Sequence, residues 1–355
     1  MFRGIYSQIN NLLAFRGLFS LRQILSAGNR FPVTVNFLIT NNCNLDCSIC
    51  SAHSMLNKAE ALPAADIICF IKKIARYKPA VFFGGGEPFI RKDIFEILHA
   101  VKQCNLKYGL VTNGTLLDQD KIKKLFNVEP EVVIFSVHGD ELGHDAKTGK
   151  KGAYSALSRA IELSVAHRKK AALLLNSVIT PDNYYDLEDI IAQGKRLGVD
   201  RVRFEQLIFL SRDEYKQHLA ACDDNGLLTE KEAEMTTYIK DINQPGIGIK
   251  LQKEVSRLKK KYGNFIIFKP YLTAKEREKW FANNFDFDRK CMFVRHSVFI
   301  KANGDIIPCQ FFSDYILGNI KTGELSDVWQ NQKRREFSAI LSKKILPGCV
   351  RCCKL

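Results

Sequence analysis

The sequence predicts an α/β fold built around a parallel β-sheet. Between residue 32 and about residue 210, short apolar segments of strand character alternate with longer segments of helical periodicity, which is typical of βαβ units. The chain has 355 residues, of which 46% are hydrophobic, so it can bury a large core and is long enough for two domains, or for one barrel with an appended unit. Polar motifs follow several apolar segments directly, at the C-terminal strand ends where such folds hold their active groups.

The predicted elements divide the chain into four parts, which are residues 1–30, 31–210, 211–290 and 291–355. In the second part, the strand-like segments with their polar ends are 33–39, 80–83, 109–114, 133–139, 173–179 and 202–205, and the helical segments are 66–76, 93–103, 119–126, 153–167 and 185–197. The third part is charged and helical in pattern and predicts a bridge between the sheet and the last part.

Three cysteines lie together on the loop that follows the first predicted strand. Cys43, Cys47 and Cys50 have the spacing C-x3-C-x2-C. Three thiolates on one short loop can hold an iron–sulfur cluster while leaving its fourth iron open to a ligand that is not protein. An open iron is what a reactive cluster needs and an electron-storage cluster does not. The alternative is a structural zinc site with His53 as a fourth ligand.

A glycine-rich turn follows the second predicted strand. Gly84, Gly85 and Gly86 stand directly before Glu87 and Pro88. Glycines let a ligand approach the backbone closely, and a carboxylate beside them can accept hydrogen bonds from an ammonium group. Alone this is an ordinary turn, but beside C-x3-C-x2-C it becomes specific. The two motifs together resemble those of the radical S-adenosylmethionine (radical SAM) superfamily.

The resemblance extends from about residue 32 to the C-terminus. It implies a partial (β/α)6 barrel of the TIM type, a 4Fe–4S cluster on Cys43, Cys47 and Cys50, and SAM bound to the open iron through its amine and carboxylate. An external one-electron donor such as flavodoxin or ferredoxin reduces such a cluster, SAM is split to methionine and a 5′-deoxyadenosyl radical, and the radical takes a hydrogen atom from the substrate. The three cysteines are therefore the implied catalytic and metal-binding residues.

The resemblance also implies the residues that contact SAM. These cofactor-binding residues are Gly84, Gly85, Gly86, Glu87, Asn113, Ser136 and Asn176. Many family members carry an arginine for the SAM carboxylate in the loop after the fourth strand. Thr148 stands at that position here, and Lys147 or Lys150 could serve instead as a point charge.

A second set of cysteines lies in the last part of the chain. Cys291 and Cys309 follow the pattern C-x12-G-x4-C, and residues 296–308 predict a β-hairpin with an Asn-Gly turn. The hairpin brings its two end cysteines together, and the C-x2-C pair Cys349 and Cys352 completes four thiolates. Four thiolates suit an iron–sulfur cluster, with zinc as the alternative.

This last part resembles the C-terminal extension called SPASM, in its shorter form called twitch. The resemblance implies one auxiliary 4Fe–4S cluster in a small domain made of a β-hairpin and a helix. Such a cluster accepts an electron from the substrate radical or positions the substrate, and ligation by four cysteines favours the electron role because no iron stays free. Cys353 is predicted to remain outside the ligand set, since neighbouring side chains diverge along the chain.

The composition of the chain indicates its cellular compartment and the classes of partner that it can bind. The 11 cysteines lie mostly at short spacings, which favours metal binding in a reducing cytosol over disulfides, and the isolated Cys69, Cys104 and Cys222 are predicted to pack in the core. No apolar run approaches the roughly 18 residues that span a bilayer, and no secretory signal is present. The net charge is +15, but no nucleic-acid-binding motif accompanies it, so we predict a cytoplasmic protein without a nucleic-acid partner.

Residues 1–30 combine apolar side chains at mostly helical spacing with arginines and no acidic side chain. A basic amphipathic helix of this kind can lie on an anionic membrane, which would make the protein peripheral to the membrane. The other interpretation is a helix that packs across the mouth of the barrel.

The sequence therefore predicts an oxidoreductase that cleaves SAM reductively and abstracts a hydrogen atom from a small metabolite or a lipid-linked molecule. A ribosomal peptide is an alternative substrate, less favoured because the 42 residues before Cys43 are few for the leader-binding domain of many peptide maturases. A non-catalytic iron–sulfur or zinc scaffold is the alternative from another functional class.

Overall fold

The structure is a computed structural model that describes residues 31–50, 61–227, 232–283, 285 and 288–354. Within these residues, ten strands form one continuous sheet in the order β10-β9-β8-β1-β2-β3-β4-β5-β6-β7. Neighbouring strands from β8 through β1 to β7 pair in parallel, whereas β9 and β10 pair in antiparallel fashion at one edge. The predicted α/β fold around a parallel sheet is confirmed.

The bounds of the elements agree closely with the predicted alternation. The strands are β1 (Thr34–Thr40), β2 (Ala80–Gly85), β3 (Tyr108–Thr112), β4 (Val132–Ser136), β5 (Ala172–Ile179), β6 (Arg201–Gln206), β7 (Ile266–Lys269), β8 (Ser297–Ile300), β9 (Asp305–Ile307) and β10 (Gly318–Asn319). The α-helices are α3 (Ala64–Ile74), α4 (Ile94–Gln103), α5 (Gln119–Asn127), α6 (Glu141–Thr148), α7 (Ala153–His167), α8 (Leu187–Arg196), α9 (Arg212–Asp224), α10 (Pro245–Tyr262), α11 (Ala274–Lys279), α12 (Phe293–His296), α13 (Leu325–Gln330) and α14 (Gln332–Lys343).

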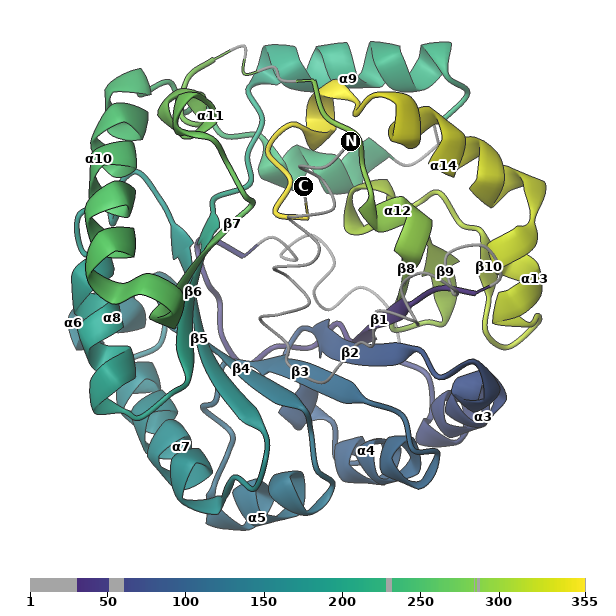
Figure 1. The fold of residues 1–355 in the computed structure, drawn as a ribbon. Coiled ribbons are helices and arrows are strands. Elements are labelled where there is room, and N and C mark those ends of the chain that lie inside the picture. The colour runs from purple at the N-terminus through teal and green to yellow at the C-terminus, as the bar shows by residue number, and fades with distance from the viewer. Residues whose placement is uncertain (1–30, 51–60, 228–231, 284, 286–287, 355) are drawn as a thin grey trace.

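The sheet curves around a central lumen, and helices α3 to α8 lie on its outer face (Figure 1). Residues alternate between the two faces along each strand. In β1, Val35 and Phe37 are at most 1% exposed and belong to the core under the helices, where the Phe37 ring packs edge-on against Phe70 of α3. Asn36 and Leu38 alternate with them and face the lumen. The core thus lies between sheet and helices, and the lumen stays available for a site.

Short polar residues begin several of these helices. Asp118 and Asp140 accept hydrogen bonds from backbone amides in the first turns of α5 and α6, and Ser211 forms a capping box with Glu214 at the start of α9. Such N-caps satisfy amides that have no partner within the helix. They fix where each helix starts, and so how long each loop at the strand ends can be.

Two features of the sheet differ from the sequence prediction. Residues 211–290 were predicted as a helical bridge, and they are mainly helical, but they also supply β7, a further parallel strand beside β6. The predicted C-terminal hairpin forms β8 and β9, and β8 pairs with β1. One sheet therefore runs through both predicted boundaries, at residues 210 and 290. The short β7 segment carries no alternating pattern that separates it from a buried turn.

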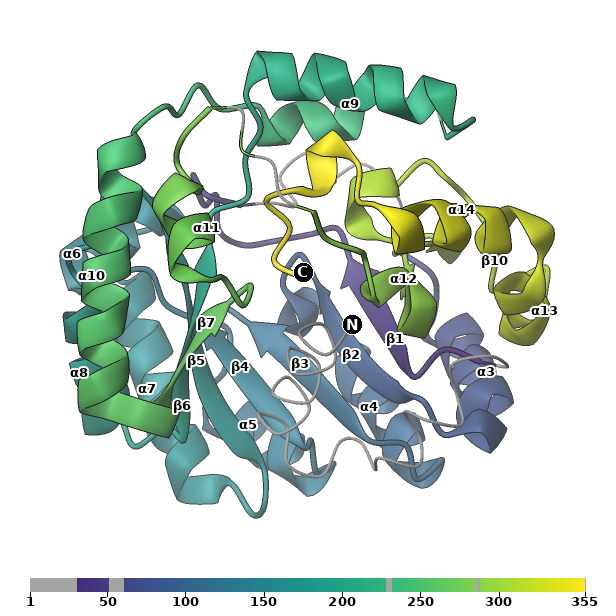
Figure 2. The same cartoon turned by 45° about the horizontal axis from the view of Figure 1, so that its top comes forward.

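The C-terminal segment and α9 lie across one end of the barrel (Figure 2). Arg351 holds them together, because its guanidinium donates to Glu214 of α9 over 2.7 Å and both side chains are at most 4% exposed. The same guanidinium donates to the carbonyl oxygens of Trp280 and Ala282, over 2.8 and 2.6 Å. A single buried side chain thus joins three segments that are distant in sequence.

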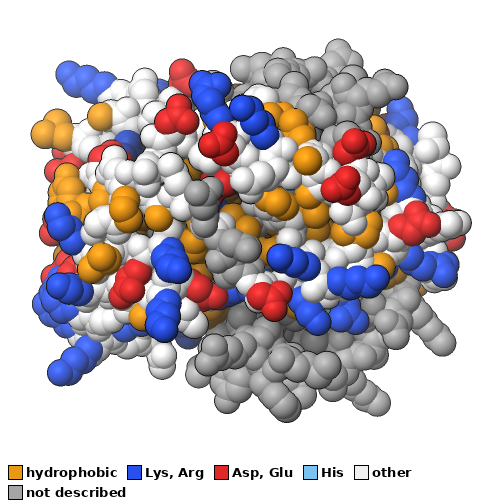
Figure 3. Space-filling view, turned by 90° about the horizontal axis from the view of Figure 1, so that it is seen from above, with side chains coloured by type: hydrophobic (Ala, Val, Ile, Leu, Met, Phe, Trp, Pro, Cys, Tyr) orange, Lys and Arg blue, Asp and Glu red, His pale blue; other side chains and the backbone are white. Residues whose placement is uncertain are grey.

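The remaining predictions on surface and packing have mixed outcomes. Cys222 is buried and Cys104 packs at the edge of the core, but Cys69 is exposed on α3, so its predicted core position is wrong. Basic and acidic side chains are interspersed on the face seen in Figure 3. In the part of the chain that the structure describes, no helix is both long and apolar enough to cross a bilayer. Residues 1–30 and His53 lie outside the described residues.

Candidate functional site

The cysteine loop, residues 41–50, leaves the C-terminal end of β1 and is fastened to the end of α6 by its backbone. The amides of Asp46 and Ser48 donate to the carbonyl oxygens of Thr148 and Lys147, over 3.1 and 3.0 Å. These carbonyl groups belong to the last turn of α6, which leaves them without partners inside the helix. The loop is therefore held in part by the free carbonyl groups at the end of α6.

The three predicted cluster ligands on this loop are half-buried. The amide of Cys50 donates to the carbonyl oxygen of Cys47 over 3.0 Å, which forms a tight turn between them. Burial, followed by the charges of Cys50 and Cys43, raises the pKa of Cys47 to about 12. Crowded thiols of this kind ionise together only when a cation compensates them, which is what bound iron provides.

The three glycines after β2 have different surroundings. A Cβ on Gly86 would lie 2.0 Å from the carbonyl oxygen of Asn42, and one on Gly85 would lie 2.5 Å from that of Thr40. Gly85 also has φ of +113°, which side chains disfavour. A Cβ on Gly84 would meet nothing within 4 Å, and Gly84 lines the central cavity. Two glycines therefore let the cysteine loop approach β2, and Gly84 alone leaves room for a ligand.

Glu87 is buried at the end of β2, with 1% of its surface exposed. Its Oε1 accepts from the amide of Phe89 over 3.1 Å and from Thr112 Oγ1 over 2.7 Å, and its Oε2 accepts from the amide of Asn113 over 2.8 Å. Burial raises the pKa of this carboxyl to about 7, although these hydrogen bonds lower it. The carboxylate thus ties the ends of β2 and β3 together and keeps one acceptor position on Oε2.

Asn113 continues this network toward the cysteines. Its Nδ2 donates to Asn44 Oδ1 over 3.0 Å and lies 4.0 Å from Cys43 Sγ. Asn44 in turn donates to Thr115 Oγ1 over 2.8 Å. The predicted SAM-contacting Asn113 is therefore beside the cysteine loop, where it supports the position of the first thiol.

Ser136 and Asn176 are register partners on β4 and β5. Ser136 is half-buried at the strand end. Asn176 is 8% exposed, and its Oδ1 accepts from Arg203 Nε of β6 over 2.6 Å. Arg203 also forms an ion pair with Glu205 over 3.3 Å. The two residues predicted to contact SAM thus differ in their surroundings, because the Asn176 side chain is bound to the charged pair Arg203 and Glu205 of the neighbouring strand β6.

The side chain of Thr148, at the position of the missing arginine, is engaged within α6. It is 1% exposed, and its Oγ1 donates to the carbonyl oxygen of His144 one turn earlier in α6, over 2.8 Å. Lys150 is exposed. The side chain of Lys147 is 15% exposed and pairs with Asp182 over 3.4 Å. Of the three residues considered for the SAM carboxylate, Lys147 is the cation held against the end of α6 that supports the cysteine loop.

Two buried histidines lie beneath this part of the site. The backbone amide of His138 donates to His144 Nδ1 over 3.2 Å, and the two rings stack with centroids 5.8 Å apart. Burial lowers the pKa of His138 to about 3 and that of His144 to about 4. Both rings are therefore neutral at physiological pH. His144 must be neutral for a second reason, because its Nδ1 accepts a hydrogen bond and so carries no proton.

The second cysteine set comes together at the other side of the lumen. Cys349 and Cys352 are 6% and 9% exposed, and Cys291 and Cys309 are half-buried. Burial, followed by the charges of Cys309 and Cys291, raises the pKa of Cys349. The pKa of Cys352 is raised by its hydrogen bond with Cys353, by burial and, among its charged neighbours, by Cys291. The four predicted ligands therefore lie within electrostatic reach of one another.

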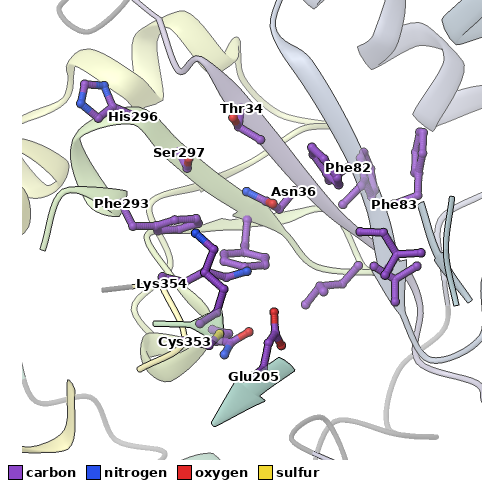
Figure 4. A pocket seen from close by; sticks show the side chains of 18 of the residues that line it. Thr34, Asn36, Phe82, Phe83, Glu205, Phe293, His296, Ser297, Cys353 and Lys354 are labelled. Atoms are coloured by element: carbon purple, nitrogen blue, oxygen red, sulfur yellow. The ribbon is translucent and has the colours of Figure 1, made fainter. Parts of the chain in front are cut away.

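Cys353 faces a different environment from the four thiols beside it. Its side chain is half-buried and lines the central cavity, in contact with Lys354 and near Glu205 (Figure 4). Its hydrogen bond with Cys352 lowers its pKa, and the nearby Lys354 and Arg203 act in the same direction. Its exclusion from the ligand set stays a prediction, and its position in the cavity was not expected.

Tyr238 lies between the two cysteine sets. It ends η4 (Glu232–Tyr238) and is 5% exposed. Burial raises its pKa, and so do the charges of Cys353, Cys352, Cys309 and, from the first set, Cys50. One buried ring is thus within electrostatic reach of thiols of both sets.

A cavity of about 320 Å³ occupies the lumen, and its lining includes Gly84 after β2 and Cys353 beside Cys352. Figure 4 shows Lys354 and Cys353 on one side and Phe82 of β2 on the other, with Glu205 below. The cavity also reaches Gly84, the first residue of the glycine turn. A volume of this size matches the lower end of small-molecule sites in proteins.

The donor chemistry of both sets fits iron–sulfur clusters. Three thiols share one loop and four thiols share the second site, with no carboxylate or imidazole among the predicted ligands. In the described part of the chain, no three His, Cys, Asp or Glu side chains converge closely enough to bind one metal ion. A cluster instead spreads its ligands over several irons.

Comparisons with known proteins agree with this geometry. Residues 37–206 match the model of the radical SAM superfamily, and residues 291–353 match that of SPASM, an iron–sulfur cluster-binding domain. The chain belongs to the radical SAM superfamily. It is an enzyme that binds a 4Fe–4S cluster and SAM, and its SPASM region binds auxiliary iron–sulfur clusters. The non-catalytic scaffold is thereby excluded.

Relatives of this radical SAM enzyme carry several different names. The chain is 23% identical over 344 residues to the tungsten-containing aldehyde ferredoxin oxidoreductase cofactor-modifying protein of Pyrococcus furiosus, covering 88% of this chain and 85% of that one. It is 25% identical over 342 residues to the Fe-coproporphyrin III synthase of Methanosarcina barkeri, covering 90% and 80%. Streptococcus suis SuiB bound to its precursor peptide SuiA has the same fold, with a TM-score of 0.66, 17% identity, and coverage of 91% and 71%.

Sequence reasoning missed the charged residues of the lumen. Arg203 and Glu205 were noted only as part of the sixth strand, and Lys269, Tyr238 and Lys354 were not noted at all. Alternating charges in β6 give a signal in retrospect, because the charged residues of a strand within a parallel barrel must face the lumen. No local signal could place Lys354 there, since its position depends on the whole C-terminal fold.

Proposed function

We propose that this radical SAM enzyme abstracts a hydrogen atom from a small metabolite that occupies the central cavity. The observation that carries the proposal is the cavity of about 320 Å³, which extends from Gly84 near the cysteine loop to Cys353 beside the second set. A substrate held there reaches the glycine turn at Gly84 and Cys353, the neighbour of the predicted ligand Cys352. A lipid-linked molecule that inserts one end into the cavity is compatible with the same geometry.

In this proposal, Cys43, Cys47 and Cys50 hold the first cluster, and Cys291, Cys309, Cys349 and Cys352 hold one auxiliary cluster. When bound and reduced by an external donor such as flavodoxin or ferredoxin, the first cluster and SAM together supply a 5′-deoxyadenosyl radical. The residues of the chain position the reactants and keep water out. Ligation by four cysteines supports an electron-accepting role for the second site.

The SAM contacts are proposed from their places at the strand ends. The remaining acceptor position of Glu87 Oε2 and the backbone of Gly84 and Gly85 receive the amine of SAM, and Lys147 balances its carboxylate. Ser136 is assigned to the ribose in preference to Asn176, because the Asn176 amide already binds Arg203. Asn113 fixes the position of the cysteine loop relative to Glu87, because it is hydrogen-bonded to both Asn44 and Glu87.

The first test changes Cys43, Cys47 and Cys50 together to alanine. The wild-type protein, reconstituted without oxygen, should contain about eight irons in two 4Fe–4S clusters, and the variant should lose about half of them. Production of 5′-deoxyadenosine under dithionite, measured by liquid chromatography and mass spectrometry, should disappear. Continued production by the triple variant would contradict the ligand assignment. Stoichiometric zinc in the second site would remove the electron-accepting role.

A peptide substrate is the second candidate, because SuiB shares this fold and was solved with its precursor peptide. The two classes are separable by isotope transfer. The enzyme is given extracts of deuterium-grown cells, divided into small-molecule, peptide and lipid fractions. Hydrogen abstraction carries deuterium into 5′-deoxyadenosine, and the small-molecule fraction should give the largest mass shift. A shift from the peptide fraction alone would favour the maturase. Liposome flotation with and without residues 1–30 tests the lipid-linked class.

A further inference from the structure

The central cavity concentrates positive charge on one wall. Arg203 and Glu205 of β6, Lys269 at the end of β7, and Lys354 of the C-terminal segment all line it. These residues come from three segments that the fold brings together. In the described residues around the cavity, the side chains of Arg203, Lys269 and Lys354 thus share one carboxylate, that of Glu205.

Lys269 is the most informative of these residues. It is 7% exposed, and its Nζ has no hydrogen-bond partner among the described residues. The ammonium group lies 4.4 Å from the centre of the Tyr271 ring, a contact that offsets only part of its lost hydration. A buried ammonium without a partner is costly, and a bound anion would remove that cost.

The other charges of the wall do not supply that partner. Arg203 donates to Asn176 Oδ1 over 2.6 Å and pairs with Glu205 over 3.3 Å, so the carboxylate is engaged within β6. Burial alone would raise the pKa of Glu205, but Arg203, Lys354 and Lys269 lower it below its usual value, so it remains ionised. Burial and the charge of Arg203 lower the pKa of Lys269 to about 7, and Lys354 adds to this. Among the described side chains, Lys269 Nζ is therefore left without an anionic hydrogen-bond partner.

The remaining walls are mainly apolar. Phe82, Val111 and Ile134 face the cavity from β2, β3 and β4, and Phe293 and Phe299 close it from the C-terminal part. Figure 4 shows Phe293 beside Lys354, with Phe82 across the open space. An occupant that fits these surroundings has an apolar body and one anionic end.

We propose that Lys269, Lys354 and Arg203 form an anion-binding subsite that recognises a carboxylate or phosphate group of the substrate. The inference rests on the proposed function, in which the substrate occupies this cavity. It narrows the substrate class to small amphiphilic acids or phosphate esters. Lys269 and Lys354 supply the ion pairs, and Arg203, held by Asn176 and Glu205, presents its remaining donors.

The subsite is tested with two probes that differ in one phosphate group, pyridoxal 5′-phosphate and pyridoxal. The unprotonated Lys269 amine condenses with the aldehyde carbon and releases water, and cyanoborohydride then delivers hydride to the imine carbon, which makes the link permanent. Labelling of the anaerobic holoenzyme is followed at Lys269 by peptide mass spectrometry. We expect the phosphorylated probe to label Lys269 at least about tenfold faster, the effect of one charge-assisted interaction.

Matched variants separate the subsite from general lysine reactivity. Lys354 also lowers the pKa of Lys269, so Lys354→Met should slow labelling by both probes, and labelling by pyridoxal 5′-phosphate should fall about tenfold more than labelling by pyridoxal. Lys321→Met, which removes an exposed lysine paired with Asp66, should change neither rate. Iron content and circular dichroism verify that each variant is folded. Equal labelling of Lys269 by both probes would overturn the proposal.

A third arm distinguishes a substrate anion from the carboxylate of SAM. Saturating SAM should leave the labelling of Lys269 unchanged, and Lys269→Met should retain SAM affinity. Protection by SAM together with weaker SAM binding in the variant would assign the subsite to SAM and overturn the substrate assignment. Labelling needs no turnover, so selective labelling in a protein that forms no 5′-deoxyadenosine would reject the proposed function and keep the anion subsite.

Discussion

The two cysteine sites use the same ligand chemistry but are built in opposite ways. The first set lies between Cys43 and Cys50 on one loop, and backbone contacts with α6 and β2 shape that loop. The second set is collected from residues 291 to 352: Cys291 precedes α12, Cys309 follows β9, Cys349 ends η7 (Pro347–Cys349), and Cys352 lies in the C-terminal segment. Cys349 and Cys352 are almost fully buried, whereas the three cysteines of the first set are half-buried.

Because of this difference, the first site depends on a few neighbouring elements and the second depends on the packing of the whole chain. The loop site needs β1, β2, α6 and the end of β3 in place, all within the first half of the chain. The second site needs the whole chain to be folded, because β8 must pair with β1 and the C-terminal segment must meet α9. We therefore expect local changes to affect the first site and changes in global packing to affect the second.

Arg351→Met gives the largest effect and the most direct test of this difference. The change leaves Glu214 buried without its partner and frees the carbonyl oxygens of Trp280 and Ala282. Breaking a buried pair from one side costs about 3–5 kcal/mol. Because Arg351 stands between Cys349 and Cys352, the auxiliary cluster should be lost first. Iron analysis should show about half the iron, and 5′-deoxyadenosine should still form.

The control for Arg351 is Lys73→Met. Lys73 and Glu324 form an ion pair over 2.9 Å in which both side chains are about 40% exposed. Exposed pairs contribute at most about 1 kcal/mol, so stability and iron content should stay near those of the wild type. If Arg351→Met instead lost the first cluster and kept the second, the proposed dependence of the sites on different parts of the fold would be wrong.

Gly86→Ala and Gly84→Ala test the first site with the same added methyl group. At position 86 the new Cβ would meet the carbonyl oxygen of Asn42 at 2.0 Å, so the cysteine loop must move. Overpacking of this kind costs about 1–3 kcal/mol, and we expect lower occupancy of the first cluster. At position 84 the Cβ meets nothing, so iron content should be unchanged. Iron analysis and electron paramagnetic resonance compare them, and equal iron loss in both would contradict the different roles of the glycines.

The sequence predicts the loop site better than the second site for the same physical reason. Spacing alone locates Cys43, Cys47 and Cys50, because ligands on one loop need no knowledge of the fold. The hairpin with Cys291 and Cys309 was predictable from its turn residues. Its pairing with β1, the insertion of β7, and the placement of Lys354 in the lumen depend on long-range packing that no local pattern encodes. Glu87 shows the same limit, since two of its three protein hydrogen bonds come from Thr112 and Asn113 at the end of β3 and not from its motif.

Acidic pH should weaken the support beneath the first site. His138 and His144 have folded pKa values of about 3 and about 4, against an ordinary value of 6.5. Between pH 6.5 and 4 the unfolded chain binds more protons at these residues, so stability falls as the pH falls through this window. Replacing His144 with glutamine should flatten the slope of unfolding free energy by about 1 kcal/mol per pH unit.

The measurement is anaerobic denaturant unfolding of the wild type and the His144→Gln variant across this pH range. Acid sensitivity of the clusters is common to both proteins and cancels in the comparison. His99→Gln, on the exposed side of α4, should keep the wild-type slope. A slope unaffected by His144→Gln would show that this ring is not held neutral by burial.

The smallest effect is expected for Cys353→Ser, compared with Cys352→Ser at the neighbouring position. Cys352 is buried with the other thiols of the second set, whereas Cys353 lines the cavity. Removing Cys352 should eliminate the auxiliary cluster, while SAM cleavage continues at the first. Removing Cys353 exchanges one small polar group for another, so both clusters and SAM cleavage should persist. Iron content, the electron paramagnetic resonance spectrum of the reduced protein and 5′-deoxyadenosine formation distinguish them. Loss of the auxiliary cluster in Cys353→Ser with its retention in Cys352→Ser would exchange the two assignments, and the cavity would then adjoin the second cluster directly through its own ligand.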